Sequence, residues 1–209
     1  MSTCGEVLVQ MLESYGVEVA FGIPGTHTIE LYRGLPATSI RHVTPRHEQG
    51  AGFMADGYAR MTGLPAACFT VSGPGALNIA TAMGQALQDS VPMLVISADN
   101  ARAQLGMGEG RLHDTDDLQA AMAQCSVWSH TLMSPAELPR VLARAFSIFR
   151  SERPGPVHLS IPIDVITASA QDVDPEPWPS STRPGPDAAA IEHAAQLLAS
   201  AQRPVIALG

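Results

Sequence analysis

The sequence contains no lysine, and charged residues of any kind make up only 15% of its 209 residues. All 12 basic residues are arginine, and 20 acidic residues outnumber them, which gives a net charge of −8. Nucleic acids and anionic lipid surfaces attract clustered positive charge, so this balance argues against both as partners. The hydrophobic content of 45% excludes disorder for most of the chain. So few charges also indicate that much of the surface is covered.

The sequence also lacks a long apolar run and a cysteine framework. Its most apolar stretch, Val91 to Ala98, is far shorter than the roughly 18 residues of a membrane span. The first residues include Glu6 and no basic cluster, unlike a secretory signal. Cys4, Cys68 and Cys125 are too widely spaced for a zinc site. We therefore expect no membrane partner, a cytoplasmic location and no metal held by this chain.

Strand-like apolar segments alternate with amphipathic helical segments over the first 168 residues. This alternation predicts an α/β domain with a doubly wound, largely parallel sheet and helices on both faces. The expected strands cover residues 19–23, 40–43, 66–71, 93–98 and 157–161. The expected helices lie at about 4–15, 29–35, 45–62, 75–89 and 134–149. A long loop containing glycines is expected after the fourth strand, where Asp114, Asp116 and Asp117 indicate an acidic helix start rather than a calcium loop.

The remainder of the chain indicates a linker and the start of another domain. Prolines are frequent from Asp172 to Asp187, so residues 169–187 are predicted to form an extended, semi-rigid linker. Asp187 then favours a helix start, and Pro204 to Leu208 is typical of a strand. One helix and one strand cannot bury their own apolar faces. We therefore interpret residues 188–209 as the truncated start of a central domain that follows domain 1–168.

Three segments rich in glycine and proline occur where predicted strands end. They are FGIPG (21–25), TPRHEQG (44–50) and SGPG (72–75), the last followed by Asn78. The carboxyl ends of parallel strands share one edge of the sheet, and such sheets bind ligands there. Glycine allows a ligand to approach the backbone closely, and proline fixes a turn. The segments therefore predict a rigid ligand-binding floor, although ordinary tight turns would have the same composition.

Five motifs, taken in order, resemble the N-terminal, pyrimidine-binding domain of thiamine-diphosphate-dependent enzymes. They are FGIPG, HEQGAGFMADGYAR (47–60), SGPGALN (72–78), DSVPMLVISA (89–98) and RPGPVHLSIPIDV (153–165). The likeness is greatest to the acetolactate synthase-like branch, which includes 2-oxo acid decarboxylases such as guanidino-oxopentanoate decarboxylase. The resemblance implies decarboxylation of a 2-oxo acid substrate. It leaves open whether carboligation follows.

The resemblance implies a catalytic role for Glu48. In the family, a glutamate at this position hydrogen-bonds a nitrogen of the aminopyrimidine ring and promotes deprotonation of the thiazolium carbon. A carboxyl group in a largely apolar cleft has its neutral form favoured, which suits it to share a proton with a ring nitrogen. The plainer interpretation is an acidic residue that compensates the dipole of a helix, worth about 0.3 to 1 kcal/mol.

The resemblance also implies further site residues. Those that match the lining of the pyrimidine pocket are Pro24, Gly25, Pro74, Gly75 and Asn78. His113 is a tentative catalytic residue, because its loop carries two adjacent histidines in pyruvate decarboxylase-like relatives. Here the second position is Asp114, and Thr26 stands where those relatives have aspartate, so their proton-handling set is incomplete. Thr26 and His27 are candidates on the substrate side.

The cofactor would lie between two chains. The resemblance implies that this domain faces the C-terminal, diphosphate-binding domain of a partner subunit, in a homodimer or tetramer. Mg²⁺ would bind in that C-terminal domain, since nothing in residues 1–209 resembles the family's GDG motif. Whether FAD occupies the central domain stays open. The chain alone is expected to be inactive.

Two alternatives to this interpretation are a non-catalytic interaction module and a separate subunit of a split 2-oxo acid decarboxylase. The intact Glu48 argues against the first. The linker and the start of a central domain argue against the second.

Overall fold

The domain is built around a six-stranded parallel sheet. The computed structural model describes residues 2–179 and 181–207. The strand order is β2-β1-β3-β4-β6-β5, and every adjacent pair is parallel. The strands are β1 (Val19–Gly22), β2 (Arg41–Val43), β3 (Ala66–Thr70), β4 (Met93–Asp99), β5 (Trp128–Thr131) and β6 (Pro156–Pro162). The predicted α/β class with a parallel sheet is confirmed.

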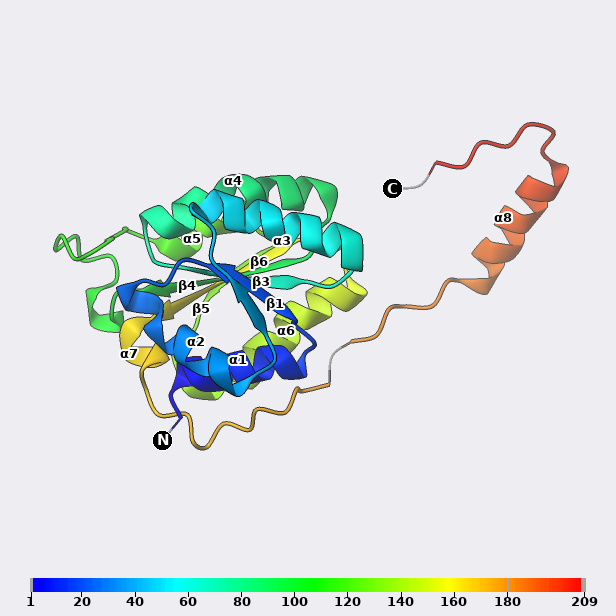
Figure 1. Ribbon diagram of the computed structural model, residues 1–209. Coiled ribbons are helices and arrows are strands. Elements are labelled where there is room, and N and C mark those ends of the chain that lie inside the picture. Colours follow the sequence, from blue (N-terminus) through cyan, green and yellow to red (C-terminus); the bar gives the residue numbers. More distant parts are fainter. Residues whose placement is uncertain (1, 180, 208–209) are drawn as a thin grey trace.

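Helices cover both faces of this sheet. They are α1 (Cys4–Ser14), α2 (Ile29–Gly34), α3 (Glu48–Thr62), α4 (Pro74–Asp89), α5 (Leu118–Ala123), α6 (Leu138–Ser151), α7 (Ile163–Ile166) and α8 (Ala188–Ser200). In Figure 1, α3, α4 and α5 lie on one face, and α1, α2, α6 and α7 lie on the other. No helix in the described part of the chain is long and apolar enough to cross a membrane.

The central strand β3 is apolar at almost every position because both of its faces are covered by helices. Ala67 and Phe69 join the core on the side of α1 and α6, whereas Ala66 and Cys68 join the core on the side of α3 and α4. Successive side chains of a strand point to opposite faces, so a strand covered on both faces is buried at every position. Burial of the thiol also raises the pKa of Cys68, which keeps it neutral.

Local signals place most helix ends correctly. The Thr3 hydroxyl accepts from the Glu6 backbone N–H at 3.3 Å, and Glu6 accepts from the Thr3 backbone N–H at 2.7 Å, so a capping box starts α1. Helix α3 begins at Glu48, later than the predicted start near Pro45. His47 is its N-cap, and its Nδ1 accepts from the Gln49 backbone N–H at 3.1 Å, an interaction that lies outside the usual capping signature.

The predicted long loop after β4 is partly wrong, because it contains α5 and β5. Asp117 caps α5 by accepting from the backbone N–H of Ala120 at 2.8 Å, which confirms the acidic helix start. Strand β5 is short and polar (WSHT) and lies at the edge of the sheet beside β6. A strand at the edge of the sheet with half-buried side chains lacks the apolar run that marks a central strand, so the segment WSHT was not predicted to be a strand.

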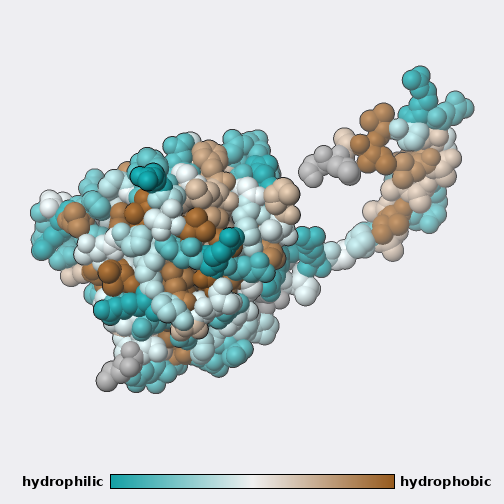
Figure 2. Space-filling model, in the orientation of Figure 1, coloured by the Kyte–Doolittle hydropathy of each residue, from teal (hydrophilic) through white to brown (hydrophobic). Residues whose placement is uncertain are grey.

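The C-terminal segment is only partly as predicted. Helix α8 forms, with Asp187 accepting from the backbone N–H of Ala190 at 2.8 Å. Residues 204–207 form no strand, since no neighbouring strand offers them hydrogen bonds, and Leu208 lies outside the described residues. Helix α8 stands clear of the domain in Figure 1, and its apolar residues are exposed in Figure 2. We keep the boundaries 1–168, 169–187 and 188–209 as a proposal.

A chain of buried polar side chains crosses four strands. The hydroxyls of Thr70 and Ser97 are 2.7 Å apart, and His158 Nε2 lies 3.0 Å from Ser97 Oγ. His158 Nδ1 lies 2.8 Å from Ser129 Oγ, so both ring nitrogens have partners. Burial lowers the pKa of His158 to about 3, because the charged imidazolium would lose its hydration. The ring is therefore neutral at physiological pH.

This neutral histidine should make the fold sensitive to acid. Below about pH 6.5 the unfolded chain binds a proton at His158 that the folded chain excludes, so the free energy of unfolding should fall as pH falls toward 3. The slope from this group is at most about 1.4 kcal/mol per pH unit. Urea denaturation at several pH values should show a shallower slope for His158→Gln than for the exposed control His193→Gln. Equal slopes in the two variants would contradict the assignment.

Candidate active site

The predicted glycine-rich and proline-rich segments meet at one edge of the sheet. The strands are parallel, so the segments after β1, β2 and β3 all leave at the carboxyl edge. Gly25 follows β1, Glu48 follows β2, and Gly75 follows β3. This is the edge at which open α/β sheets bind ligands. The structure therefore agrees with the predicted position of the floor.

Glu48 and Asn78 form the polar centre of this edge. The Asn78 amide Nδ2 donates to Glu48 Oε2 at 2.9 Å, joining the first turn of α3 to α4. Asn78 is exposed and Glu48 is half-buried, so both remain accessible from solvent. A carboxylate that accepts from a neutral amide keeps free acceptor capacity, since each carboxylate has about four lone-pair sites. The pair can thus offer an acceptor and an amide to a ligand at the same place.

Gly25 and Gly75 are required because one side chain, Val71, fills the space between their loops. A Cβ at Gly25 would lie 2.5 Å from Val71 Cγ1, and a Cβ at Gly75 would lie 2.6 Å from Val71 Cγ2. The position of the Gly75 Cβ is also 3.7 Å from Glu48 Oε1. The Val71 side chain therefore packs against the backbone of both Gly25 and Gly75, next to Glu48. The sequence analysis missed Val71, although a β-branched residue directly before SGPG was an available signal.

The remaining pocket candidates lie on the same loops. Pro24 is exposed, and Pro74 is exposed at the first position of α4, where its fixed φ suits a helix start. The Gly25 loop is held by Thr28, whose hydroxyl donates to the Gly25 carbonyl at 3.0 Å and accepts from its N–H at 3.1 Å. Thr26 is exposed, whereas His27 is buried. Cofactor contacts at these positions stay predictions.

A second group of polar side chains lies beside these loops. Ser72 Oγ is 3.3 Å from His27 Nδ1, and the rings of His27 and His113 meet edge to face with centroids 6.2 Å apart. His113 adopts φ +56°, and its carbonyl lies against Gly73, where a Cβ would come within 2.7 Å. His113 Nδ1 is buried and has no hydrogen-bond partner among the described residues. The structure therefore brings His27 and His113 together, a contact that their separation in sequence did not predict.

Burial controls the charge of this second group. It lowers the pKa of His27, and the neighbouring His113 lowers it further, while Asp99 acts in the opposite direction. Burial also raises the pKa of Asp99, although the Asn100 N–H and the Ser160 hydroxyl favour its carboxylate. A neutral His27 can accept or donate one proton. No group of three metal-ligating side chains was found in residues 2–179 and 181–207.

Comparison with known proteins identifies the family. The sequence profile of the "Thiamine pyrophosphate enzyme, N-terminal TPP binding domain" matches residues 2–126. The chain belongs to this family. It is 53% identical over 213 residues to the "Probable 2-ketoarginine decarboxylase" of Pseudomonas aeruginosa, covering 99% of this chain and 37% of that protein. The predicted resemblance to the thiamine-diphosphate enzymes is confirmed.

Acetolactate synthases are also similar to this member of the thiamine pyrophosphate family. The acetolactate synthase isozyme 1 large subunit of Escherichia coli is 37% identical, covering 99% of this chain and 37% of the relative. The Corynebacterium glutamicum acetolactate synthase large subunit is 39% identical, covering 99% of this chain and 33% of the relative. The chain thus spans little more than a third of the length of these curated relatives.

The contact of Val71 with Gly75 makes a stability prediction. Gly75→Ala should lower the free energy of unfolding by about 1 to 3 kcal/mol, because the new Cβ overlaps the Val71 side chain. Gly84→Ala on the same helix is the matched control. A Cβ at Gly84 meets open space, and alanine is the better helix former, so stability should rise by about 0.5 to 1 kcal/mol. Urea denaturation measures both, and a Gly75→Ala protein as stable as the parent would refute the packing argument.

Proposed function

We propose that this chain supplies the pyrimidine-binding half of the active site of a thiamine-diphosphate-dependent 2-oxo acid decarboxylase. The observation that carries the proposal is the Glu48 to Asn78 hydrogen bond of 2.9 Å at the carboxyl edge of the sheet, in a chain that belongs to the thiamine pyrophosphate family. The greater identity to a protein named as a decarboxylase, 53% against 37%, favours decarboxylation over carboligation as the activity to test first.

The residues at this edge fit an aminopyrimidine ring. Such a ring presents ring nitrogens that accept and an amino group that donates. A protonated Glu48 can donate to a ring nitrogen, and the Asn78 amide can donate or accept. Gly25 and Gly75 carry no Cβ, which lets their loops pack on Val71 beside Glu48. We therefore assign the holding of the ring to Glu48, Asn78, Gly25 and Gly75.

Glu48 has the task of holding a proton where the ring binds. Its carboxyl group, fixed by Asn78, would share a proton with a ring nitrogen, and the helix that it begins keeps it in place. When bound, thiamine diphosphate supplies the electron sink that the loss of CO₂ requires. His27, neutral and buried beside Ser72 and His113, is available to move a proton on the substrate side.

We propose a 2-oxo acid with a cationic tail as the substrate to test first. The 2-ketoarginine in the name of the Pseudomonas relative is a 2-oxo acid that carries a guanidinium group. A cavity of about 230 Å³ at the carboxyl edge has Asp99, Asp116 and Asp117 in its wall, and no arginine among its lining residues. Carboxylates without a basic partner suit a positively charged ligand.

An apolar face on α3 supports the proposal of a partner subunit. Gly50, Met54, Gly57 and Met61 recur at helical spacing on the exposed side of this helix, and Met61 is 85% exposed. The face begins beside Glu48, so a domain seated on it would also close over the cofactor site. We propose that it is covered by the C-terminal, diphosphate-binding domain of a partner subunit in a homodimer or tetramer. That domain would hold the diphosphate and Mg²⁺.

Replacement of Glu48 tests the chemistry directly. In the full-length enzyme, Glu48→Gln should slow deuterium exchange at the thiazolium carbon of bound thiamine diphosphate by about 10² to 10⁴, since an amide cannot transfer a proton to the ring nitrogen. Cofactor affinity should change by less than tenfold, because the amide still hydrogen-bonds. NMR measures the exchange and calorimetry the affinity. Glu192→Gln on the exposed helix α8 is the control, and exchange at the parent rate in Glu48→Gln would refute the assigned role.

The proposal also predicts that the 209 residues alone are inactive. Incubated with thiamine diphosphate, Mg²⁺ and a panel of 2-oxo acids, they should release CO₂ no faster than cofactor alone, because the diphosphate half of the site is absent. Adding a C-terminal, diphosphate-binding domain should restore turnover if the site is shared. Turnover without that domain would refute the proposal that this chain supplies only half of the active site. A tight complex of the two domains without turnover would favour the alternative that the chain is a non-catalytic interaction module.

A further inference from the structure

A large cleft in the described part of the chain lies away from the candidate active site. Its volume is about 650 Å³, within the range of small-molecule sites. Its walls come from the end of α1, the turn between α3 and β3, the residue before β4, the end of α6, and the linker. The residues used below include Tyr15, Leu64, Phe146, Phe149, Arg150 and Arg183. Strands β3 and β4 begin here, so the cleft opens at the amino edge of the sheet, opposite Glu48.

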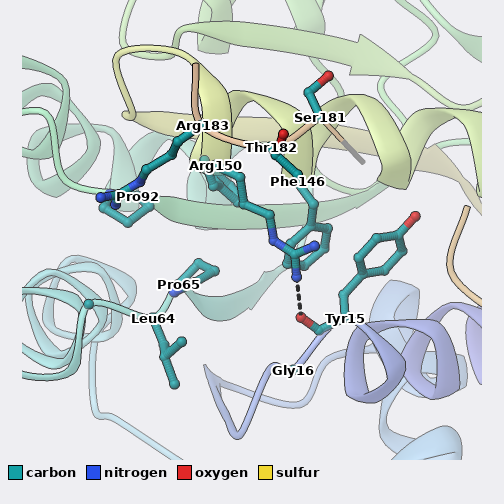
Figure 3. Close-up of a pocket in the computed structure, with 12 residues that line it drawn as sticks. Tyr15, Gly16, Leu64, Pro65, Pro92, Phe146, Arg150, Ser181, Thr182 and Arg183 are labelled. Atoms are coloured by element: carbon teal, nitrogen blue, oxygen red, sulfur yellow. Dashed lines mark hydrogen bonds between the residues drawn. The ribbon is translucent and has the colours of Figure 1, made fainter. Parts of the chain in front are cut away.

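The floor of the cleft is built on three aromatic side chains that are themselves buried: Tyr15 is 5%, Phe146 1% and Phe149 8% exposed. The Tyr15 and Phe146 rings stack at a centroid distance of 4.2 Å with an interplanar angle of 6°, and Phe149 packs edge to face on Phe146 at 5.6 Å. Figure 3 shows the Tyr15 and Phe146 rings side by side, with Leu64 and Pro65 across the cleft. The packed rings support the floor, and the apolar surface that a ligand can reach comes from Leu64, Pro65 and Pro92.

The cleft also carries the charge opposite to that of the protein. Arg150 lies over the Phe146 ring at 5.9 Å, and its Nη2 donates to the Tyr15 carbonyl at 3.3 Å, so its guanidinium is held over the floor. Arg183 reaches the cleft from the linker and forms no ion pair within the described residues. No lining residue is acidic, although the chain has a net charge of −8. Two guanidinium groups, one from α6 and one from the linker, with no acidic lining residue to neutralise them, favour an anion.

We propose that this cleft is a second ligand site, which binds an organic anion with an apolar body. The anionic group would lie against Arg183, and the body would lie against Leu64, Pro65 and Pro92. Because residues 181–183 form one wall, a bound ligand would hold the linker against the domain. The site shares no residue with the Glu48 edge, so it stands whether or not the proposed decarboxylase activity is found.

The experiment compares two fluorescent probes with the same rings. One is 8-anilinonaphthalene-1-sulfonate, an aromatic anion, and the other is N-phenyl-1-naphthylamine, which lacks the sulfonate. Titrations use the protein expressed from its natural gene, so that any further part of the chain is present to cover the cleft. Variants are Arg183→Gln, which removes the charge on the linker, and Leu64→Ala, which removes apolar wall. Arg140→Gln, exposed on the same helix as Arg150 but outside the cleft, is the control.

Arg183→Gln should weaken binding of the sulfonate probe by about tenfold and change binding of the uncharged probe by less than twofold. Leu64→Ala should weaken both, and Arg140→Gln neither. Displacement by 3-phenylpropionate but not by its amide would assign the site to carboxylates, and displacement by adenosine monophosphate would assign it to phosphates. The proposal is overturned if the sulfonate probe binds Arg183→Gln as tightly as the parent, or if the two probes lose affinity equally.

Discussion

Every strand of the sheet runs in the same direction, and the rest of the molecule depends on this constraint. Parallel neighbours cannot be joined by tight hairpins, so the chain must cross back over a face of the sheet between strands, and helices do so on both sides. Both faces of the central strands are therefore covered, which explains the burial of β3 and β4 at every position. The same constraint gathers all the strand ends at one edge and all the strand starts at the other.

The two edges of the sheet consequently have different chemistry. The carboxyl edge carries Glu48, Asn78, His27 and His113, and Val71 fills the space between the Gly25 and Gly75 positions there. The amino edge carries an aromatic floor and two arginines, one of them supplied by the linker. The linker thus connects α8 to the edge remote from Glu48. A ligand bound in this cleft, as proposed above, would contact the linker and none of the residues at the carboxyl edge.

Burial, rather than residue type, sets the state of the histidines. His158 lies inside the sheet with a hydroxyl at each ring nitrogen, and burial holds its pKa far below the ordinary value. His27 is buried beside Ser72 and a second histidine, so its pKa is also lowered, but it lies at the edge where a substrate could reach it. One histidine therefore lies inside the sheet, and the other lies at its carboxyl edge.

The sequence by itself determined the parallel α/β class, the end of α3 at Thr62, the start of α8 after Asp187, and the segments that carry Glu48, Gly75 and Asn78. These features depend on local signals: apolar runs, capping residues and glycines at strand ends. Tertiary structure alone decided the contacts between segments far apart in the chain, such as Val71 with Gly25 and Gly75, and His27 with His113. It also made the polar segment WSHT into an edge strand, because β6 was there to pair with it, and left residues 204–207 without a partner. A strand requires hydrogen bonds from another part of the chain, and no local pattern contains that information.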